Sequence, residues 1–183
     1  MFLIVGRTAS GKDYLASRME DRGYKAVISR TTRPSRGEGD RHIFLTEEQS
    51  KLDKDRVADT VINGYQYYTT VEDIDGKDIY IVDPVGLKSM SKLGYNVDII
   101  YIKASEEERR KHFTERGETD EKFNSRNSAE DKQFTEFEEA IDNMKVTDYI
   151  KHRNLIVINN KYNRQFTEDM IDSIEGIIKQ YIA

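Results

Sequence analysis

The sequence contains no cysteine, only two prolines and only three histidines. Without cysteine the protein has no disulfide, no thiolate metal site and no cysteine nucleophile. The histidines, His42, His112 and His152, are far apart and lack the spacing of metal ligands, so we expect no structural metal. No apolar run is long enough to span a membrane, and MFLIV at the start lacks the basic leader of a signal peptide. We therefore expect a soluble cytoplasmic protein.

The sequence also lacks an excess of positive charge. It has 29 lysines and arginines against 34 acidic residues, which gives a formal net charge of -5. We therefore expect the protein to bind neither nucleic acid nor an anionic membrane. An enzyme of small anions can still carry a local basic cluster, so the placement of individual cations matters more than their total. A length of 183 residues suits one domain with a sizeable core.

Strand-like and helix-like stretches alternate along the chain, which predicts an α/β fold with a parallel sheet covered by helices. The expected strands are MFLIV, YKAVIS, KDIYIVD, VDIIYIK and NLIVIN. Helices are predicted over Lys12–Arg22, Val85–Leu93 and Asp120–Asn143, the first two being followed by glycine. Ser105 begins a capping box, and Thr167 is expected to cap the last helix.

Residues 30–70 interrupt this alternation. They contain the loop TTRPSRGEGDR, a short helix candidate from Thr46 and two strand-like runs around Asn63-Gly64, which is a hairpin signal. We expect a small mixed insertion and not a separate domain. Residues 1–183 would then form one domain, with a core made of residues 1–29 and 71–183.

The stretch GRTASGKD, residues 6–13, has the Gly-x-x-x-x-Gly-Lys spacing of a phosphate-binding loop between a strand and a helix. Its glycines let the backbone curl so that amide hydrogens and the helix N-terminus point at phosphate oxygens. The alternative is a glycine turn that only joins the strand to the helix. The residues predicted to bind ATP here are Gly6, Arg7, Thr8, Ala9, Ser10, Gly11, Lys12 and Asp13.

Asp13 stands where such loops usually have a serine or threonine whose hydroxyl binds Mg²⁺. A carboxylate is also a hard oxygen ligand, so Asp13 is the candidate magnesium ligand, directly or through water. The alternative is an acidic residue placed at a helix N-terminus, which the helix dipole favours.

The loop SRTTRPSRGEGDRHIF brings together Arg30, Arg33, Arg36 and Arg41 without any apolar periodicity. Arginine suits bidentate capture of phosphate. The alternative is a solvated basic loop.

Together these segments resemble a known family. The runs GRTASGK, SRTTRPSRGE, GYQYYTT, IYIVDPVG and ERG follow one another in the order, and at nearly the spacing, of guanylate kinases. The resemblance covers almost the whole chain and is strongest from Gly6 to Gly86. It implies a P-loop NTPase core, a monophosphate-binding insertion over residues 30–70 and a helical lid over about residues 111–132. It also implies ATP as donor, Mg²⁺ as cofactor and GMP or dGMP as acceptor.

The resemblance implies a role for each matching residue. The monophosphate would contact Ser29, Arg33, Arg36, His42, Asp59, Tyr68, Thr70 and Asp83. Lys12, Arg116 and Arg126 would act on the transferring phosphate, and Asn159 and Asn160 match the turn that contacts adenine. Three positions depart from the family pattern: Asp59 replaces a glutamate, His42 replaces a tyrosine, and Ile81 replaces the first acid of the pair that Asp83 completes.

Physical chemistry supports a guanine site. Guanine presents N1–H and N2–H₂ donors, which suit the carboxylates of Asp59 and Asp83, and Thr70 can donate to O6. Adenine would set an acceptor nitrogen against a carboxylate. The alternatives are that Asp59 is an ordinary hairpin acid and that Asp83 is an ordinary acid at a strand end. Tyr65 and Tyr67 share one strand face and Tyr68 lies on the other, so one set is expected to pack in the core.

Two other functions stay open at this point. A phage-type deoxynucleoside monophosphate kinase has a similar Gly-Lys-Asp loop ending, and Ile81, Asp59 and His42 leave room for a different base. A non-catalytic guanylate kinase-like module binds protein ligands, but such modules lose the ATP loop, which this chain retains.

Overall fold

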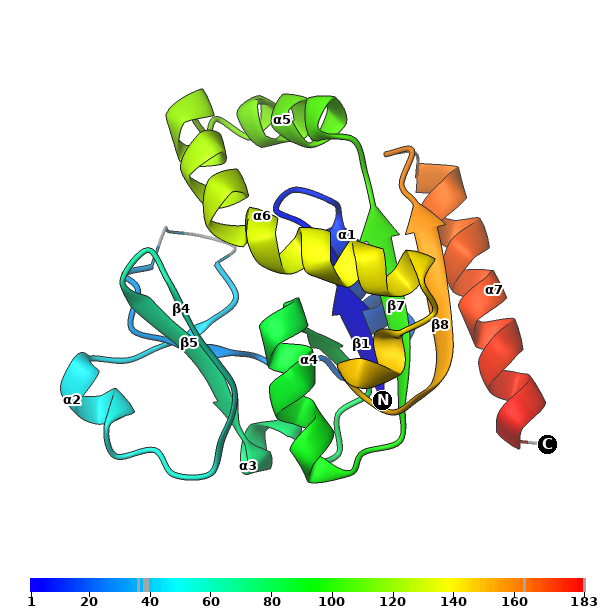
Figure 1. Cartoon of the computed structure of the whole chain (residues 1–183), viewed down its shortest axis with the longest axis horizontal. Coiled ribbons are helices and arrows are strands. Elements are labelled where there is room, and N and C mark those ends of the chain that lie inside the picture. Colours follow the sequence, from blue (N-terminus) through cyan, green and yellow to red (C-terminus); the bar gives the residue numbers. More distant parts are fainter. Residues whose placement is uncertain (36, 38–39, 163, 183) are drawn as a thin grey trace.

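The computed structural model describes residues 1–35, 37, 40–162 and 164–182, and its larger sheet is the parallel sheet that the sequence predicts (Figure 1). Four parallel strands lie in the order β6-β1-β7-β8. Their bounds are β1 Phe2–Val5, β6 Ile79–Ile81, β7 Val97–Lys103 and β8 His152–Asn159. Every residue of β1 is buried, as expected for a central strand covered on both faces.

The predicted strand YKAVIS is wrong in extent. Only Ala26 pairs with the sheet, in an isolated parallel bridge to Ile79. The chain then leaves this sheet, because the Ser29 carbonyl accepts from Ile43 and the next residues, β2 Arg30–Thr31, pair with a second sheet. A run at the sheet edge has one neighbour only, and here that neighbour holds it over very few residues.

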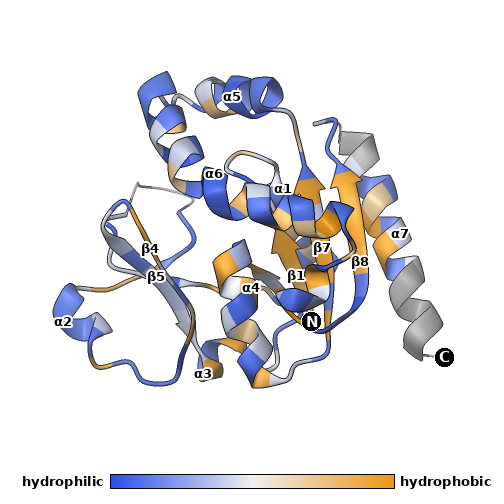
Figure 2. Cartoon of the chain, in the orientation of Figure 1, coloured by the Kyte–Doolittle hydropathy of each residue, from blue (hydrophilic) through white to orange (hydrophobic). Residues whose placement is uncertain are grey.

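Helices cover both faces of the parallel sheet. On one face α1 Lys12–Asp21 and α7 Arg164–Ile182 enclose a cluster with Phe2 and Ile4. On the other, α4 Pro84–Met90 and α6 Asp120–Asp142 pack with Leu3 and Val5. Successive β1 side chains therefore serve opposite cores, as the strand pleat requires. Figure 2 shows the hydrophobic strands between helices whose outward residues are hydrophilic.

Most predicted helix ends are confirmed. α1 stops before Gly23, and α4 continues into the short 3-10 turn Ser91–Leu93 before Gly94, both glycines having positive φ. Ser105 caps α5 Glu106–Glu115 through the expected capping box. A second 3-10 turn, Val146–Asp148, precedes β8. The cap assigned to Thr167 is wrong, since α7 already begins at Arg164 and Thr167 is a buried residue inside it.

Residues 30–70 form a second, mixed sheet beside the first. Its strand order is β3-β2-β5-β4, with β3 Ile43–Phe44, β4 Arg56–Ile62 and β5 Tyr65–Thr70. The short helix α2 Glu47–Ser50 lies within this segment, and α3 Val71–Ile74 follows it directly. The predicted β4–β5 hairpin is confirmed, and Asn63 and Gly64 both have positive φ, as a type I′ turn requires. Thr46 caps α2 as expected.

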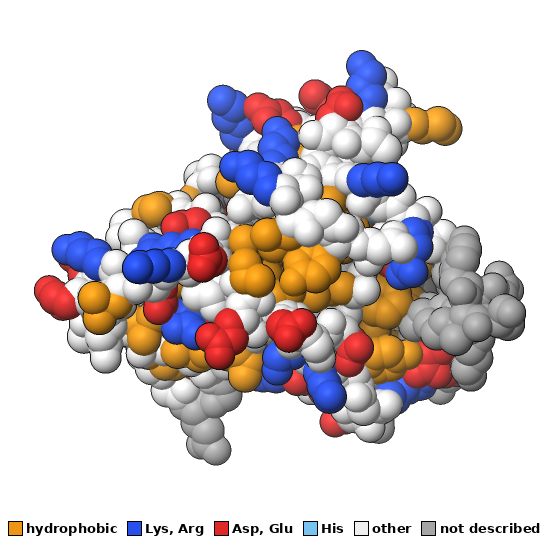
Figure 3. Space-filling model, turned by 90° about the horizontal axis from the view of Figure 1, so that it is seen from below, with side chains coloured by type: hydrophobic (Ala, Val, Ile, Leu, Met, Phe, Trp, Pro, Cys, Tyr) orange, Lys and Arg blue, Asp and Glu red, His pale blue; other side chains and the backbone are white. Residues whose placement is uncertain are grey.

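The surface bears both signs of charge. In the view from below, acidic and basic side chains are interspersed around a group of hydrophobic side chains near the middle (Figure 3). Among the helices that the structure describes, none is both long and apolar enough to cross a membrane.

Candidate functional site

The loop after β1 has a backbone that only glycine accommodates at two points. A Cβ on Gly6 would lie 2.5 Å from the Ser10 hydroxyl oxygen and 2.7 Å from the Ile102 carbonyl. Gly11 has a φ of 98° and precedes α1, and a Cβ there would lie 2.5 Å from Asn160 Nδ2. The glycines of the predicted phosphate loop are therefore required by its shape.

The chain after β8 supports this loop from one side. Asn160 Nδ2 donates to the Ser10 carbonyl at 2.8 Å, and the Tyr162 hydroxyl donates to the Ala9 carbonyl at 2.7 Å. Asn160 Oδ1 in turn accepts from the Tyr162 backbone N–H. Asn160, to which the resemblance assigns an adenine contact, thus holds the loop in this structure, while the Asn159 side chain is exposed. Tyr162 has no sequence signal that marks this role.

Arg7 anchors the loop to α6. Its guanidinium donates to Glu138 at 3.1 and 3.2 Å and to Asp131 at 2.9 Å, and the side chain is mostly buried. The Tyr101 hydroxyl donates to the same Glu138 carboxylate. The Arg7 guanidinium is therefore engaged by acids of α6 and ties the loop to that helix.

Glu130 of α6 lies directly on the loop. Its Oε1 accepts from the Thr8 backbone N–H at 2.7 Å, and its Oε2 accepts from the Thr8 hydroxyl at 3.0 Å. Arg109 of α5 donates to the Thr8 carbonyl at 3.2 Å and lies 3.7 Å from Glu130 Oε1. Burial lowers the pKa of the Arg109 guanidinium, and its Nε is buried without a hydrogen-bond partner among the residues that the structure describes. Neither Glu130 nor Arg109 was predicted from the sequence. Both lie in strongly charged stretches, in which no pattern distinguishes one acid or one arginine from its neighbours.

Lys12 and Asp13 begin α1 at the end of the loop. Lys12 Nζ donates to the Arg7 carbonyl at 2.9 Å. Burial lowers the pKa of the Lys12 ammonium, and the neighbouring carboxylates of Asp13 and Glu130 oppose that shift. Asp13 is exposed in the first turn of the helix. The helix N-terminus therefore has a cation and an acid side by side.

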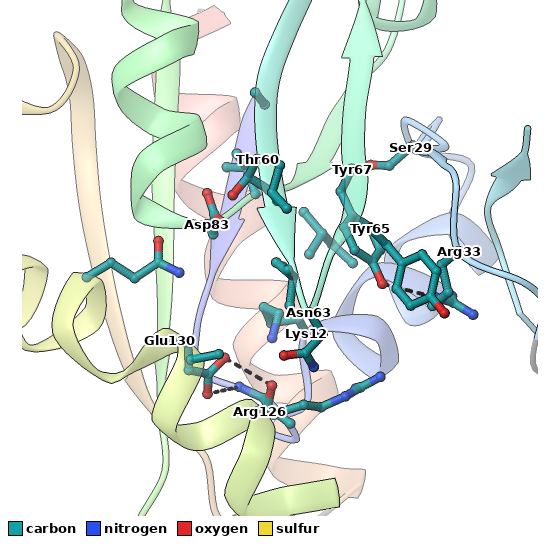
Figure 4. A pocket seen from close by; sticks show the side chains of 18 of the residues that line it. Lys12, Ser29, Arg33, Thr60, Asn63, Tyr65, Tyr67, Asp83, Arg126 and Glu130 are labelled. Carbon is teal, nitrogen blue, oxygen red and sulfur yellow. Dashed lines mark hydrogen bonds between the residues drawn. The ribbon is translucent and has the colours of Figure 1, made fainter. Parts of the chain in front are cut away.

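A cavity of about 640 Å³ connects the loop with the second sheet (Figure 4). Tyr65 and Tyr67 of β5, which the sequence did not single out as ligands, also line it. Of the predicted site residues, those in its wall are Gly6, Thr8, Lys12, Asp13, Ser29, Arg33, His42, Tyr68, Asp83 and Arg126. The predicted donor-phosphate and acceptor residues thus share one cavity.

Asp59 does not line this cavity. The β4–β5 pairing shifts register between Val57 and Thr60, and Ala58 has a φ of 52°. In this irregular part of the strand, Ala58 and Thr60 line the cavity, whereas Asp59 between them does not. The Asp59 side chain is 42% exposed and lies 3.5 Å from Arg56.

Other predicted residues also lie outside the cavity wall: Arg7, Ala9, Ser10, Gly11, Thr70, Arg116, Asn159 and Asn160. Thr70 caps α3, its hydroxyl accepting from the Asp73 backbone N–H at 3.3 Å. Arg116 is exposed at the end of α5, where its Nε donates to the His112 carbonyl. Asn160 holds the loop, as described above. Arg36 falls outside the residues that the structure describes.

Arg33 is already held by a carboxylate. It donates two bonds to Asp40, at 2.7 and 2.9 Å, and its Nε donates to the Tyr67 hydroxyl at 3.0 Å. The Asp40 hydrogen bond raises the pKa of the guanidinium. His42 Nδ1 lies 2.9 Å from Asp40, and burial lowers the pKa of its imidazole although Asp40 opposes the shift. Asp40 thus accepts hydrogen bonds from the Arg33 guanidinium, which the resemblance assigns to binding a phosphate.

Tyr68 contributes its ring to the cavity wall. Its hydroxyl donates to Asp53 at 2.7 Å, and the Arg56 guanidinium lies 4.0 Å from the ring centre. Burial and Asp53 raise the pKa of Tyr68 to about 12. The hydroxyl is therefore engaged inside the second sheet.

Asp83 follows β6 and caps α4. Its Oδ1 accepts from the Gly86 backbone N–H at 2.6 Å. A Cβ on Gly86 would lie 2.2 Å from Val82 Cγ2, so close packing requires this glycine. Burial raises the pKa of the Asp83 carboxyl, although Gly86 and the nearby Gln133, Thr60 and Lys12 oppose the shift.

Magnesium would need ligands from a bound nucleotide. Among the described residues there is no group of three or more histidines or acids that could hold a metal. Mg²⁺ commonly uses one or two carboxylates together with phosphate oxygens and water, and exposed Asp13 beside the loop fits that pattern.

Comparison with known proteins adds no relative. The chain matches no protein-family model and no curated protein.

Proposed function

We propose that this protein transfers the γ-phosphoryl group of ATP to a nucleoside monophosphate, GMP or dGMP, on a core of the P-loop NTPase type. One observation carries the proposal. Lys12 and the glycine loop line the same cavity as Arg33 and His42, which lie between strands β2 and β3 of the second sheet. Figure 4 shows Lys12 and Arg33 at this cavity. Two sets of groups suited to phosphate therefore face one space, as a transfer between two nucleotides requires.

The positions of two acids support phosphate binding. Asp40 accepts two hydrogen bonds from Arg33, and Glu130 accepts one from a backbone N–H of the loop. A carboxylate is an oxyanion whose geometry resembles one edge of a phosphate group. Both protein acids thus bind where the proposal puts phosphate oxygens.

The chemistry needs no general base, because a phosphate acceptor is already anionic. The protein would act by positioning the two nucleotides and by neutralising charge through Lys12, Arg33 and Arg126. When bound, Mg²⁺ would add positive charge at the donor phosphates beside Asp13. The insertion over residues 30–70 and a lid over about residues 111–132 would exclude water, which otherwise competes with the acceptor.

A second candidate is a deoxynucleoside monophosphate kinase with another base preference. It is favoured by the positions of Asp59 and Thr70 outside the cavity wall and of Ile81 within it. These leave fewer groups for guanine than the sequence suggested.

A panel of monophosphates tests both candidates. GMP, dGMP, AMP, CMP and TMP are each mixed with ATP, Mg²⁺ and protein, and ADP release is measured. We expect GMP or dGMP to be the best acceptor. Faster turnover of TMP, CMP or AMP would favour the second candidate. Absence of turnover with all five, together with no thermal shift on adding ATP, would overturn the kinase proposal.

A further inference from the structure

Two buried oxygen atoms in the cavity wall have no hydrogen-bond donor. They are Asp83 Oδ2 and Gln133 Oε1, and neither has a partner within the described part of the chain. Buried acceptors are nearly always paired in proteins, because an unpaired one has lost its water without replacement. The pair therefore marks a place where a ligand with N–H or O–H groups fits.

The Asp83 side chain is fixed by a hydrogen bond, and Gln133 lies on a helix that packs in the core. Asp83 is fixed by its bond to the Gly86 N–H, which uses Oδ1 and leaves Oδ2. Gln133 lies on α6 next to Phe134, a buried member of the core that α6 shares with α4. Gln133 also lies close enough to Asp83 to favour its charged form. The two acceptors thus come from different elements and meet at one wall.

Only one common base presents two adjacent donors to such a wall. Guanine has N1–H beside N2–H₂, whereas adenine and cytosine each have an acceptor nitrogen beside the amino group. Thymine and uracil have one N–H between two carbonyl oxygens. A wall of two acceptors therefore favours guanine and leaves unpaired groups with the other bases.

We propose that Gln133 is a specificity-determining residue, whose Oε1 accepts one N–H of guanine while Asp83 accepts the other. Gln133 takes the role that the sequence pattern gave to Asp59, whose side chain lies outside the cavity wall. This inference rests on the proposed kinase function and names a residue that distinguishes guanine from the other bases.

The test compares GMP with AMP as acceptors of wild type and Gln133→Leu, at saturating ATP. We expect kcat/KM for GMP to fall by about ten- to a hundredfold, the usual effect of losing a buried hydrogen bond to a ligand. AMP offers no donor at N1, so its kcat/KM should stay the same or rise. The ratio of GMP to AMP is the readout, because a general disturbance of the fold lowers both values together.

Three further variants sharpen the result. Gln133→Glu keeps an acceptor and should retain the preference for GMP, and Gln133→Met repeats the test at constant length if leucine prevents folding. Glu136→Leu, at an exposed position of α6 outside the cavity wall, is the matched control and should leave the ratio unchanged. An unchanged ratio in Gln133→Leu or Gln133→Met would overturn the role of Gln133 while the kinase stands. A wild type that phosphorylates no monophosphate would overturn both.

Discussion

The Glu130 carboxylate accepts hydrogen bonds from both the backbone N–H and the hydroxyl of Thr8, at 2.7 and 3.0 Å. An acid of α6 therefore uses a backbone donor of the very loop that we propose to bind the ATP phosphates. Phosphate oxygens would compete with this carboxylate for the same N–H. They would also be repelled by its charge, which is mostly buried and close to Arg109.

Glu130→Gln should tighten ATP binding. The variant removes the competing charge and leaves Arg109 with less compensation, and both effects favour an incoming anion. We expect the Kd for ATP to fall by about tenfold, corresponding to one charge-assisted hydrogen bond. Calorimetric titration measures this, with Glu136→Gln, an exposed acid of the same helix, as control. Weaker binding in Glu130→Gln would show instead that the acid holds the loop in its binding shape.

Lys12→Met should nearly abolish turnover while the fold survives. The ammonium is proposed to neutralise charge on the transferring phosphate, and its loss should lower kcat by at least about a hundredfold. Burial already disfavours the charged form of Lys12, so a neutral side chain of similar length should not lower the melting temperature. Steady-state kinetics and a thermal melt check the two expectations, with Lys92→Met, at an exposed position outside the cavity wall, as control. A variant with the wild-type rate would refute the phosphate-loop interpretation.

The sequence predicted the parts of the fold that local patterns determine. Runs of apolar residues identified β1, β7 and β8, and Asn63-Gly64 identified the hairpin turn. The YKAVIS segment has the same apolar character, but it lies at the sheet edge and the residues after it pair with the second sheet. Its pairing with the parallel sheet is therefore limited to a bridge at Ala26. Whether an apolar run stays in a sheet depends on which neighbours are available, and these come from distant parts of the chain.

The sequence predicted those residues of the candidate site whose backbone conformation it also predicted. The loop glycines and Lys12 follow from their spacing, whereas Asp59 depends on a bulge at Ala58, a non-glycine residue with positive φ that no sequence signal marks. Glu130 and Gln133 were missed for another reason. Their helix is strongly charged along its length, so periodicity alone does not show which side chains face the cavity.

Asp83→Asn should stabilise the folded protein at neutral pH. Burial raises the pKa of Asp83 above 3.8, its value in the unfolded chain, so the unfolded chain loses the proton first as pH rises. The wild type therefore loses stability from about pH 4 up to the raised pKa, and the deficit persists above it. Asparagine does not titrate and still caps α4.

Melting temperatures of both proteins between about pH 4 and pH 8 test this sign. The variant's advantage should grow with pH and then level off, while its turnover of GMP falls. An advantage that is largest at the acid end would mean that the Asp83 carboxylate is stabilised, not penalised, by its surroundings.

The last prediction distinguishes the arginine proposed to bind the acceptor nucleotide from the arginine proposed to act on the transferring phosphate. Arg33 lies between strands β2 and β3 and is proposed to serve the acceptor phosphate, whereas Arg126 of α6 is proposed to serve the transferring group. The acceptor contact exists before the transition state, so Arg33→Ala should raise KM for the monophosphate by about ten- to a hundredfold. Charge on the transferring group is complete only during transfer, so Arg126→Ala should lower kcat by a similar factor.

Arg33→Ala also removes the partner of Asp40, so its effect must be separated from a loss of fold. The double variant Arg33→Ala/Asp40→Ala removes both charges and should restore the melting temperature but not KM. Initial-rate kinetics with each substrate varied in turn give the two constants. If Arg33→Ala lowered only kcat and Arg126→Ala raised only KM, the two arginines would have exchanged roles. A double variant with a normal KM for the monophosphate would show that Arg33 only pairs with Asp40. If Arg33 bound the acceptor phosphate, removing Asp40 could not restore the lost contact.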